Sequence, residues 1–144
     1  MQVAEIMSNQ TILTINLDFT LLEAREYMLN HRINHVPVID DEGKLAGLIT
    51  QNDVERNISP NVGTLREHGS DRDTLEMKVH RIMNRSPKVV SSDTEIADAA
   101  NILAAREATC LFVINRERRI IGIVTVVDLL RFLAKLTREA KKVR

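Results

Sequence analysis

GLITQNDV, at residues 47–54, is repeated 75 residues later as GIVTVVDL, at residues 122–129. The glycine, threonine and aspartate are identical in the two segments, and the preceding runs INHVPVID (33–40) and ATCLFVIN (108–115) also correspond. Ile6-Met7 has a weaker echo in Ile82-Met83. Since one unit of a repeat often cannot bury its apolar face alone, the sequence predicts two related units with an internal pseudo-twofold axis.

Within each repeat the spacing of apolar residues changes in the same order. Short β-rich runs at 11–15 and 88–90 precede candidate helix caps, which are Asp18 and Thr20, then Asp93 and Thr94. Helical spacing follows, with apolar stripes at Leu21, Ala24 and Met28, and at Ile96, Ala99, Ala100 and Leu103. Strands are expected at 36–39 and 45–49, and again at 111–114 and 120–124, each pair followed by a helix. The predicted fold class is α/β (α+β), with the order β-α-β-β-α in each unit.

The repeats also define the predicted domain limits. Repeat 1 spans 1–58, a linker spans 59–77, repeat 2 spans 78–137, and 138–144 forms a basic C-terminal tail. The linker contains the turn-forming runs SPNVG and HGSD among dense charges, which predicts a partly mobile connector. The tail is expected to be frayed and solvated.

Composition narrows the class of protein. The 144 residues carry 20 basic and 20 acidic side chains, so no net charge attracts nucleic acid or an anionic membrane. Aromatic residues make up 3%, which is few for a base-stacking surface. Cys110 is the single cysteine, and the sequence shows neither a signal-peptide pattern nor a membrane-spanning apolar run. These features predict a soluble, cytoplasmic protein.

The repeated Thr-x-x-Asp segments contain the candidate ligand-binding side chains. Thr50 and Thr125 each open a helix, where a hydroxyl and nearby backbone N–H groups can receive an anion. Asp53 and Asp128 lie in the first turn, where a carboxylate can accept the two hydroxyls of a ribose. One turn further, the guanidinium groups of Arg56 and Arg131 can meet a phosphate. The pattern therefore indicates a nucleoside phosphate site, made twice.

With its two repeats and the Thr-x-x-Asp segment in each of them, the chain resembles the CBS domain pair, also called a Bateman module. The resemblance covers nearly the whole chain and is carried by Val3-x-x-Ile6-Met7, HVPVID at 35–40, GKLAGLITQND at 43–53, and the weaker second copy. It implies a regulatory protein without catalytic residues that binds AMP, ADP, ATP or S-adenosylmethionine as a ligand, with no cofactor. It assigns the ribose to Asp53 and Asp128, with supporting contacts from Thr50 and Thr125.

The resemblance also implies that each ligand cleft borrows the first strand of the other repeat. One cleft joins Pro87, Lys88 and Val89 to His35, Val36, Pro37, Thr50 and Asp53; the other joins Thr11, Ile12 and Leu13 to Cys110, Leu111, Phe112, Thr125 and Asp128. His35 and Lys88 favour charged nucleotides in the first cleft. The second is expected to be empty or to hold a weakly charged compound such as S-adenosylmethionine, with Phe112 against the base or in its place.

Other interpretations remain open. The threonines and aspartates can serve as helix caps alone, Arg56 and Arg131 can be ordinary surface residues, and Cys110 is expected to be a small buried apolar residue. A metal site is not expected, because His31, His35, His68 and His80 lack further ligands at suitable spacing. An enzyme is disfavoured, since no catalytic motif is present.

The function expected from the sequence is an adenosine-ligand sensor, with energy sensing among its roles, that signals to an unidentified protein target by changing shape or association. The alternative is a purely structural dimerisation module. Family members commonly pair the helices that begin near Thr20 and Thr94, so a homodimer is expected, formed through the two apolar stripes.

Overall fold

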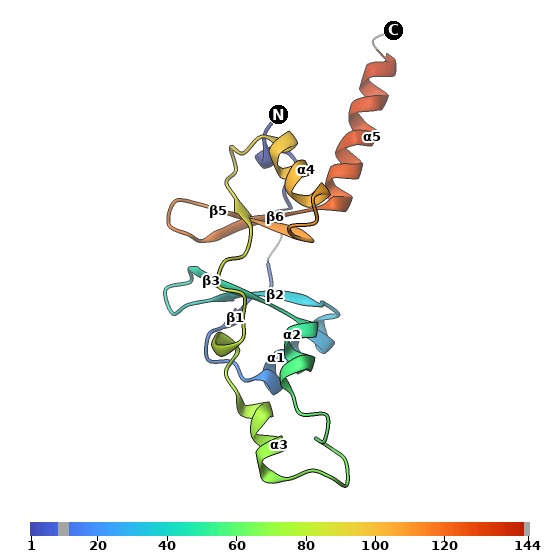
Figure 1. Ribbon diagram of the computed structural model, residues 1–144. Coiled ribbons are helices and arrows are strands. Elements are labelled where there is room, and N and C mark those ends of the chain that lie inside the picture. The colour runs from blue at the N-terminus through green and yellow to red at the C-terminus, as the bar shows by residue number, and fades with distance from the viewer. Residues whose placement is uncertain (9–11, 143–144) are drawn as a thin grey trace. The chain divides into compact units, whose positions relative to one another are not determined.

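The computed structural model describes residues 1–8 and 12–142. The chain forms two compact units. The inner unit comprises Leu13–Pro87, and the terminal unit comprises Met1–Ile12 together with Lys88–Arg144. Each unit contains one three-stranded sheet with helices packed on one face of that sheet (Figure 1). This is the mixed α+β fold that the repeat predicts.

The inner unit follows the predicted order of elements. Its chain runs through β1 (Ile15–Asn16), α1 (Leu21–His31), β2 (His35–Ile39), β3 (Leu45–Thr50) and α2 (Gln51–Asn57). Strand β2 is central, parallel to β1 and antiparallel to β3. After α2 come α3 (Gly69–Asp73) and two 3-10 turns, η2 (Thr74–Glu76) and η3 (Val79–Arg81).

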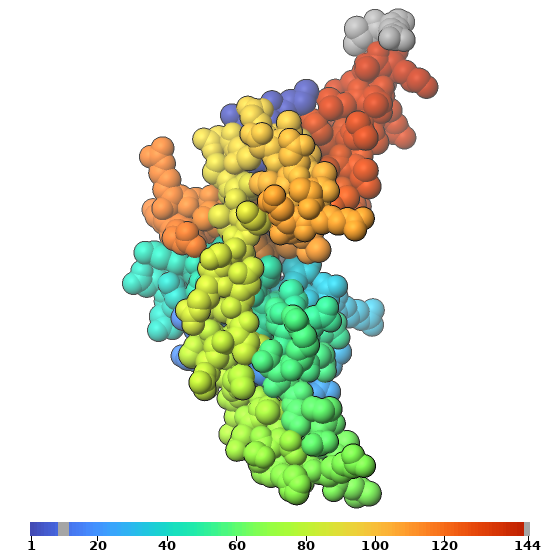
Figure 2. All heavy atoms as spheres, in the orientation of Figure 1, coloured from blue at the N-terminus to red at the C-terminus, as the bar shows by residue number. Residues whose placement is uncertain are grey.

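The terminal unit repeats this topology. It opens with the 3-10 turn η1 (Val3–Glu5) and continues with β4 (Val89–Val90), α4 (Ile96–Ala104), β5 (Cys110–Ile114), β6 (Ile120–Thr125) and α5 (Val126–Lys142). Strand β5 is central, parallel to β4 and antiparallel to β6. Figures 1 and 2 show the C-terminal part of α5 extending away from the sheet of its own unit.

The opening segment of each sequence repeat packs in the unit built mainly from the other repeat. In the terminal unit, Val3 N donates to Thr94 O at 2.8 Å, and Ser8 forms a bridge with Ile123. In the inner unit, Leu48 N donates to Asn84 O at 2.9 Å. The compact units therefore exchange these segments relative to the sequence repeats.

Both predicted helix stripes are buried inside their own units. Leu21, Ala24 and Met28 on α1 are at most 3% exposed, and Ile96, Ala99 and Leu103 on α4 are at most 7% exposed, while Ala100 is half-buried. These side chains join the two aliphatic cores, which stabilise the fold because burial removes apolar area from water. The burial of both stripes, which their helical spacing predicts, is therefore confirmed, whereas the expectation that they are left partly uncovered for pairing is wrong.

Several element limits differ from those expected. The first strand is Ile15–Asn16 rather than 11–15, and residues 9–11 lie outside the described part of the chain. The predicted cap at Thr20 is confirmed, since its Oγ1 accepts from Glu23 N at 3.1 Å. Helix α4 instead begins after Glu95 without a side-chain cap, because the Thr94 hydroxyl accepts from Ser91 N.

The connector contains long-range hydrogen bonds, and most of the tail is helical, while the expected mobility of the connector stays a prediction. Ser59 Oγ donates to Asp71 Oδ1 at 2.7 Å, and Thr74 Oγ1 accepts from Ser59 N at 3.0 Å, which ties α3 to the end of α2. Helix α5 continues to Lys142 in place of a frayed segment from Arg138. No helix in the described part of the chain is both long and apolar enough to cross a membrane.

Candidate functional site

Thr50 and Asp53 cap the first turn of α2 together. Thr50 Oγ1 accepts from Asp53 N at 3.2 Å, and Asp53 Oδ2 accepts from Thr50 N at 2.9 Å. This reciprocal pair satisfies two backbone N–H groups at the helix start and holds the carboxylate in one orientation. Thr50 and Asp53 therefore form a helix cap, which leaves Asp53 Oδ1 for a further partner.

Thr125 and Asp128 repeat the arrangement at the start of α5. Asp128 Oδ2 accepts from Thr125 N at 2.9 Å and from the Thr125 hydroxyl at 3.1 Å. Asp128 N donates back to Thr125 Oγ1 at 3.3 Å. The two Thr-x-x-Asp segments therefore share one local geometry, as their identical spacing predicts.

The two carboxylates differ in their second oxygen. Asp53 Oδ1 accepts from Arg56 Nη2 at 2.9 Å, so the predicted phosphate-binding guanidinium is bonded to the predicted ribose-binding group. Within the described part of the chain, Asp128 Oδ1 has no hydrogen-bond partner, and Arg131 has neither a hydrogen bond nor an ion pair. The second copy therefore has the more available carboxylate and guanidinium.

Cross-strand pairing places one candidate residue beside each threonine. His35 is opposite Thr50 in the pairing of β2 with β3, and Cys110 is opposite Thr125 in the pairing of β5 with β6. Val36, Pro37, Leu111 and Phe112 follow on the same strands and are buried. Phe112 is only 1% exposed, but its neighbours Leu111 and Val113, and not Phe112, belong to the aliphatic core of the unit. The expected placement of Phe112 against a base, or in the place of a base, stays a prediction.

Burial determines the charge state of both paired residues. Partial burial lowers the pKa of His35 from its ordinary value, so its ring is neutral at pH 7 and lies 2.8 Å from Asn34 Oδ1. Burial raises the pKa of the Cys110 thiol to about 11, which keeps it protonated and unreactive. Cys110 is thus the small buried residue that the sequence predicts.

Some residues were expected to complete the ligand cleft of the opposite repeat, and two of these make contacts within their own unit. Lys88 Nζ lies 3.5 Å from Glu107 Oε2, and Val89 pairs with Phe112, all within the terminal unit. Ile12 and Leu13 are half-buried, and Thr11 lies outside the described residues. The expected contributions of these residues to a cleft of the opposite repeat stay predictions.

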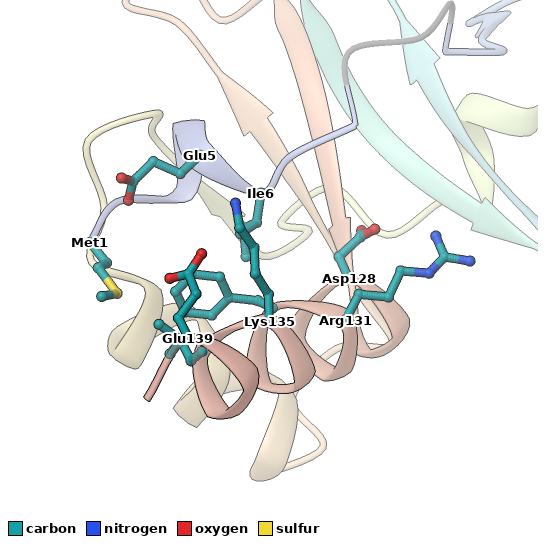
Figure 3. A pocket seen from close by; sticks show the side chains of 9 residues that line it. Met1, Glu5, Ile6, Asp128, Arg131, Lys135 and Glu139 are labelled. Atoms are coloured by element: carbon teal, nitrogen blue, oxygen red, sulfur yellow. The ribbon is translucent and has the colours of Figure 1, made fainter. Parts of the chain in front are cut away.

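A cavity beside Asp128 was not predicted from the sequence. Its volume is about 340 Å³, and it lies between α5 and the segment at Met1–Ile6 of the same unit (Figure 3). Its lining consists of Met1, Glu5, Ile6, Asp128, Arg131, Phe132, Lys135, Leu136 and Glu139. The helical spacing from Asp128 through Lys135 to Glu139 is the sequence signal that could have indicated it.

The described residues contain no group of three or more histidine, cysteine or carboxylate side chains suited to a metal ion. The polar groups of the site are instead carboxylates, hydroxyls and cations on helix starts. Such a set can bind a sugar and a charged substituent.

Comparison with known proteins agrees with the geometry. The CBS domain model matches residues 3–60 and 79–135. A CBS domain-containing protein of Dictyostelium discoideum is 33% identical over 136 residues, which cover 93% of this chain and 92% of the relative.

Two solved structures share the fold. The CBS domain pair of protein MJ0100, in complex with 5′-methylthioadenosine and S-adenosyl-L-methionine, is 25% identical with a TM-score of 0.71, covering 94% of this chain and 97% of that one. CBSX2 in complex with AMP is 24% identical with a TM-score of 0.76, covering 94% and 98%. Because the family model matches both repeats, the chain belongs to the CBS domain family.

Proposed function

We propose that this protein is a regulatory module that binds an adenosine-containing ligand. The observation that carries the proposal is the Asp128 carboxylate, which the cap at Thr125 orients and whose Oδ1 has no partner among the described residues. Related CBS domain pairs have been solved with S-adenosyl-L-methionine, 5′-methylthioadenosine or AMP, which supports an adenosine ligand here.

Asp128 accepts the two ribose hydroxyls in this proposal. The helix cap holds the carboxylate before the ligand arrives, so little side-chain entropy is lost on binding. In the first repeat, a ribose has to compete with Arg56 for Asp53 Oδ1. We therefore place the tighter site at Asp128, whereas the sequence alone favours the first cleft for charged nucleotides.

Ligand titration of matched variants tests the proposal. Asp128→Ala is expected to weaken binding of adenosine compounds by about thirtyfold, since loss of a charged hydrogen-bond acceptor costs about 2 kcal/mol. Asp53→Ala is the matched control and is expected to have a smaller effect on the tighter site. Isothermal titration calorimetry measures both, and unchanged affinity in both variants would contradict the ribose role.

We further propose that a second copy of the chain covers the exposed apolar face of α5. Val126, Leu130 and Leu133 are 47%, 59% and 55% exposed, and they fall within about 60° of one another around the helix. A contiguous apolar stripe left in water is an interaction surface. The homodimer expected from the sequence is thus retained, with a different surface from the buried stripes.

CBS domain pairs are generally regulatory rather than catalytic, and we propose no reaction for this chain. Signalling would proceed through a ligand-dependent change in shape or association that a protein target detects, and energy sensing would follow if the ligand is a nucleotide. We propose the cytoplasm as the location of the protein, which is compatible with its single, unpaired and buried cysteine, Cys110.

A further inference from the structure

Another cavity lies in the terminal unit, at the far end of its sheet from Thr125. Its volume is about 680 Å³, which suits a small-molecule ligand. Residues 89–94, residues 114–116 and Ile121 line it, so its walls come from the ends of β4 and β5 and the start of β6. Strand β5 has Cys110, the partner of Thr125, at its other end, about 13 Å away. The cavity is therefore separate from the proposed adenosine site at Asp128.

The two repeats differ in side-chain size at this cavity. Ser92 and Thr94 stand where the first repeat has Leu17 and Phe19, 75 residues earlier. The parallel strand pairs that precede these positions have the same register in both units. Leu17 and Phe19 pack against the core of the inner unit, and the Phe19 ring lies edge-on to the Tyr27 ring, with a centroid distance of 6.1 Å. Small hydroxyl side chains in their place leave room in the terminal unit.

The repeats differ in charge at this cavity as well. Arg116 takes the place of Asp41, which in the inner unit accepts a hydrogen bond from Asn16 Nδ2 at 3.3 Å. Among the described residues, the Arg116 guanidinium makes no hydrogen bond and no ion pair. Asp93 lines the same cavity, and its pKa is lowered by the hydrogen bond from the Ser91 hydroxyl and, more weakly, by the charge of Arg116, so its carboxylate is ionised at pH 7. Opposite charges that line one cavity without pairing are available to a ligand that carries both.

Aliphatic side chains also line the cavity, and they are Val89, Val90, Ile114 and Ile121. Val90 is buried and the other three are half-buried, so part of this apolar surface meets water. An aliphatic ligand group that covers it removes apolar area from water, which favours binding.

We propose that this cavity binds a free α-amino acid with an aliphatic side chain, such as leucine. The ligand carboxylate pairs with the Arg116 guanidinium, which suits a planar carboxylate, and the ligand ammonium pairs with Asp93. The ligand side chain packs against the aliphatic lining. This inference goes beyond the proposed function, because it adds a ligand of different chemistry at a different site.

The same pair of charges disfavours ligands with one sign of charge. A phosphate or a dicarboxylate brings negative charge next to Asp93, and a polyamine brings positive charge next to Arg116. Like charges brought together in a binding site cost free energy and exclude the wrong ligand. The cavity therefore selects a zwitterion by repulsion as well as by attraction.

Calorimetric titration of the full chain with three probes tests this inference. L-leucine carries both charges, 4-methylpentanoate lacks the ammonium group, and 3-methylbutylamine lacks the carboxylate. The wild-type protein is expected to bind L-leucine at least about tenfold more tightly than either analogue.

Two variants that restore the residues of the first repeat test the location of the site. Arg116→Asp is expected to weaken L-leucine binding by at least about tenfold, since it replaces the attraction for the ligand carboxylate with repulsion. The double variant Ser92→Leu/Thr94→Phe fills the cavity and is expected to abolish binding. Arg106→Asp is the matched control for charge, because Arg106 is exposed in the same unit and does not line the cavity. Its affinity for L-leucine is expected to equal that of the wild-type protein.

Equal affinities of the wild-type protein for L-leucine and either analogue would overturn the inference, because a single charge would then suffice. Binding of L-leucine that persists in both Arg116→Asp and the double variant would also overturn it, since the ligand would lie elsewhere. Failure of the wild-type protein to bind L-leucine would overturn the inference and leave the proposed adenosine site standing, because Thr125, Asp128 and Arg131 do not line this cavity.

Discussion

At the scale of single residues, Gly47 and Gly122 occupy places where a side chain has no room. A Cβ at Gly47 would lie 2.6 Å from Met83 Sδ and 2.8 Å from the backbone oxygen of Asn84. At Gly122 the corresponding neighbour is Met7 Sδ, at 2.7 Å. The glycines and the Ile-Met echoes thus repeat in the sequence because they meet in space.

Gly47→Ala is expected to destabilise the inner unit by about 1–3 kcal/mol, as overpacking of a filled site does. The backbone of Asn84 cannot move aside without breaking its bridge to Leu48. Gly69→Ala is the matched control, because a Cβ there meets no atom within 4 Å and alanine favours its helix. Urea unfolding measures both variants, and equal stability of the two would contradict this packing.

A second prediction concerns His35 and pH. Burial lowers the pKa of His35 below the value of 6.5 that applies in the unfolded chain, so the unfolded state binds the proton more readily. The free energy of unfolding should therefore fall as the pH drops below about 6.5. His35→Gln should relieve part of this loss in urea unfolding between pH 7 and pH 5. His31→Gln, at an exposed position, should not relieve it.

At the scale of elements, one short 3-10 turn stabilises the interior of each unit. Val3 in η1 and Val79 in η3 are equivalent positions, and each is 0% exposed within its own unit. Val79 N donates to Phe19 O at 2.8 Å, just as Val3 N donates to Thr94 O at 2.8 Å. Each turn thus fixes a segment from one sequence repeat onto the body of the other.

The swapped position of the opening segments predicts which backbone amides each 3-10 turn protects from hydrogen exchange. Val3→Ala should raise the hydrogen-exchange rates of the β6 amides, and Val79→Ala should raise those of the β3 amides. Each substitution truncates a buried side chain and should destabilise its own unit by about 1–3 kcal/mol. The two variants are controls for each other. The swapped position of the opening segments would be contradicted if Val3→Ala raised the hydrogen-exchange rates of β3 and left those of β6 unchanged.

At the scale of the whole molecule, the exposed stripe on α5 predicts self-association. Leu130→Lys should shift the protein toward monomer in analytical ultracentrifugation, because burying an ammonium group in an apolar contact is costly. Leu65→Lys is the matched control, since Leu65 is an exposed leucine too but belongs to the connector rather than to the stripe. A wild-type protein that stays monomeric at high concentration would exclude this pairing.

The repeat, the order of elements and the Thr–Asp caps could all be predicted from the sequence. Each depends on residues close together in the chain: a cap needs partners three residues apart, and strands and helices show their period within a few residues. The ribose-binding candidates Asp53 and Asp128 are therefore correctly located at helix starts.

Only the tertiary structure decided which groups around those aspartates are available. Arg56 and Arg131 have the same spacing from their aspartates, but the first is bonded to its carboxylate and the second lines a cavity. The exchange of opening segments and the cavity beside Met1–Ile6 depend on contacts between residues that are at least 36 positions apart in the sequence. Local periodicity carries no information about such contacts, because it reports only which residues a few positions apart share one face of a helix or strand.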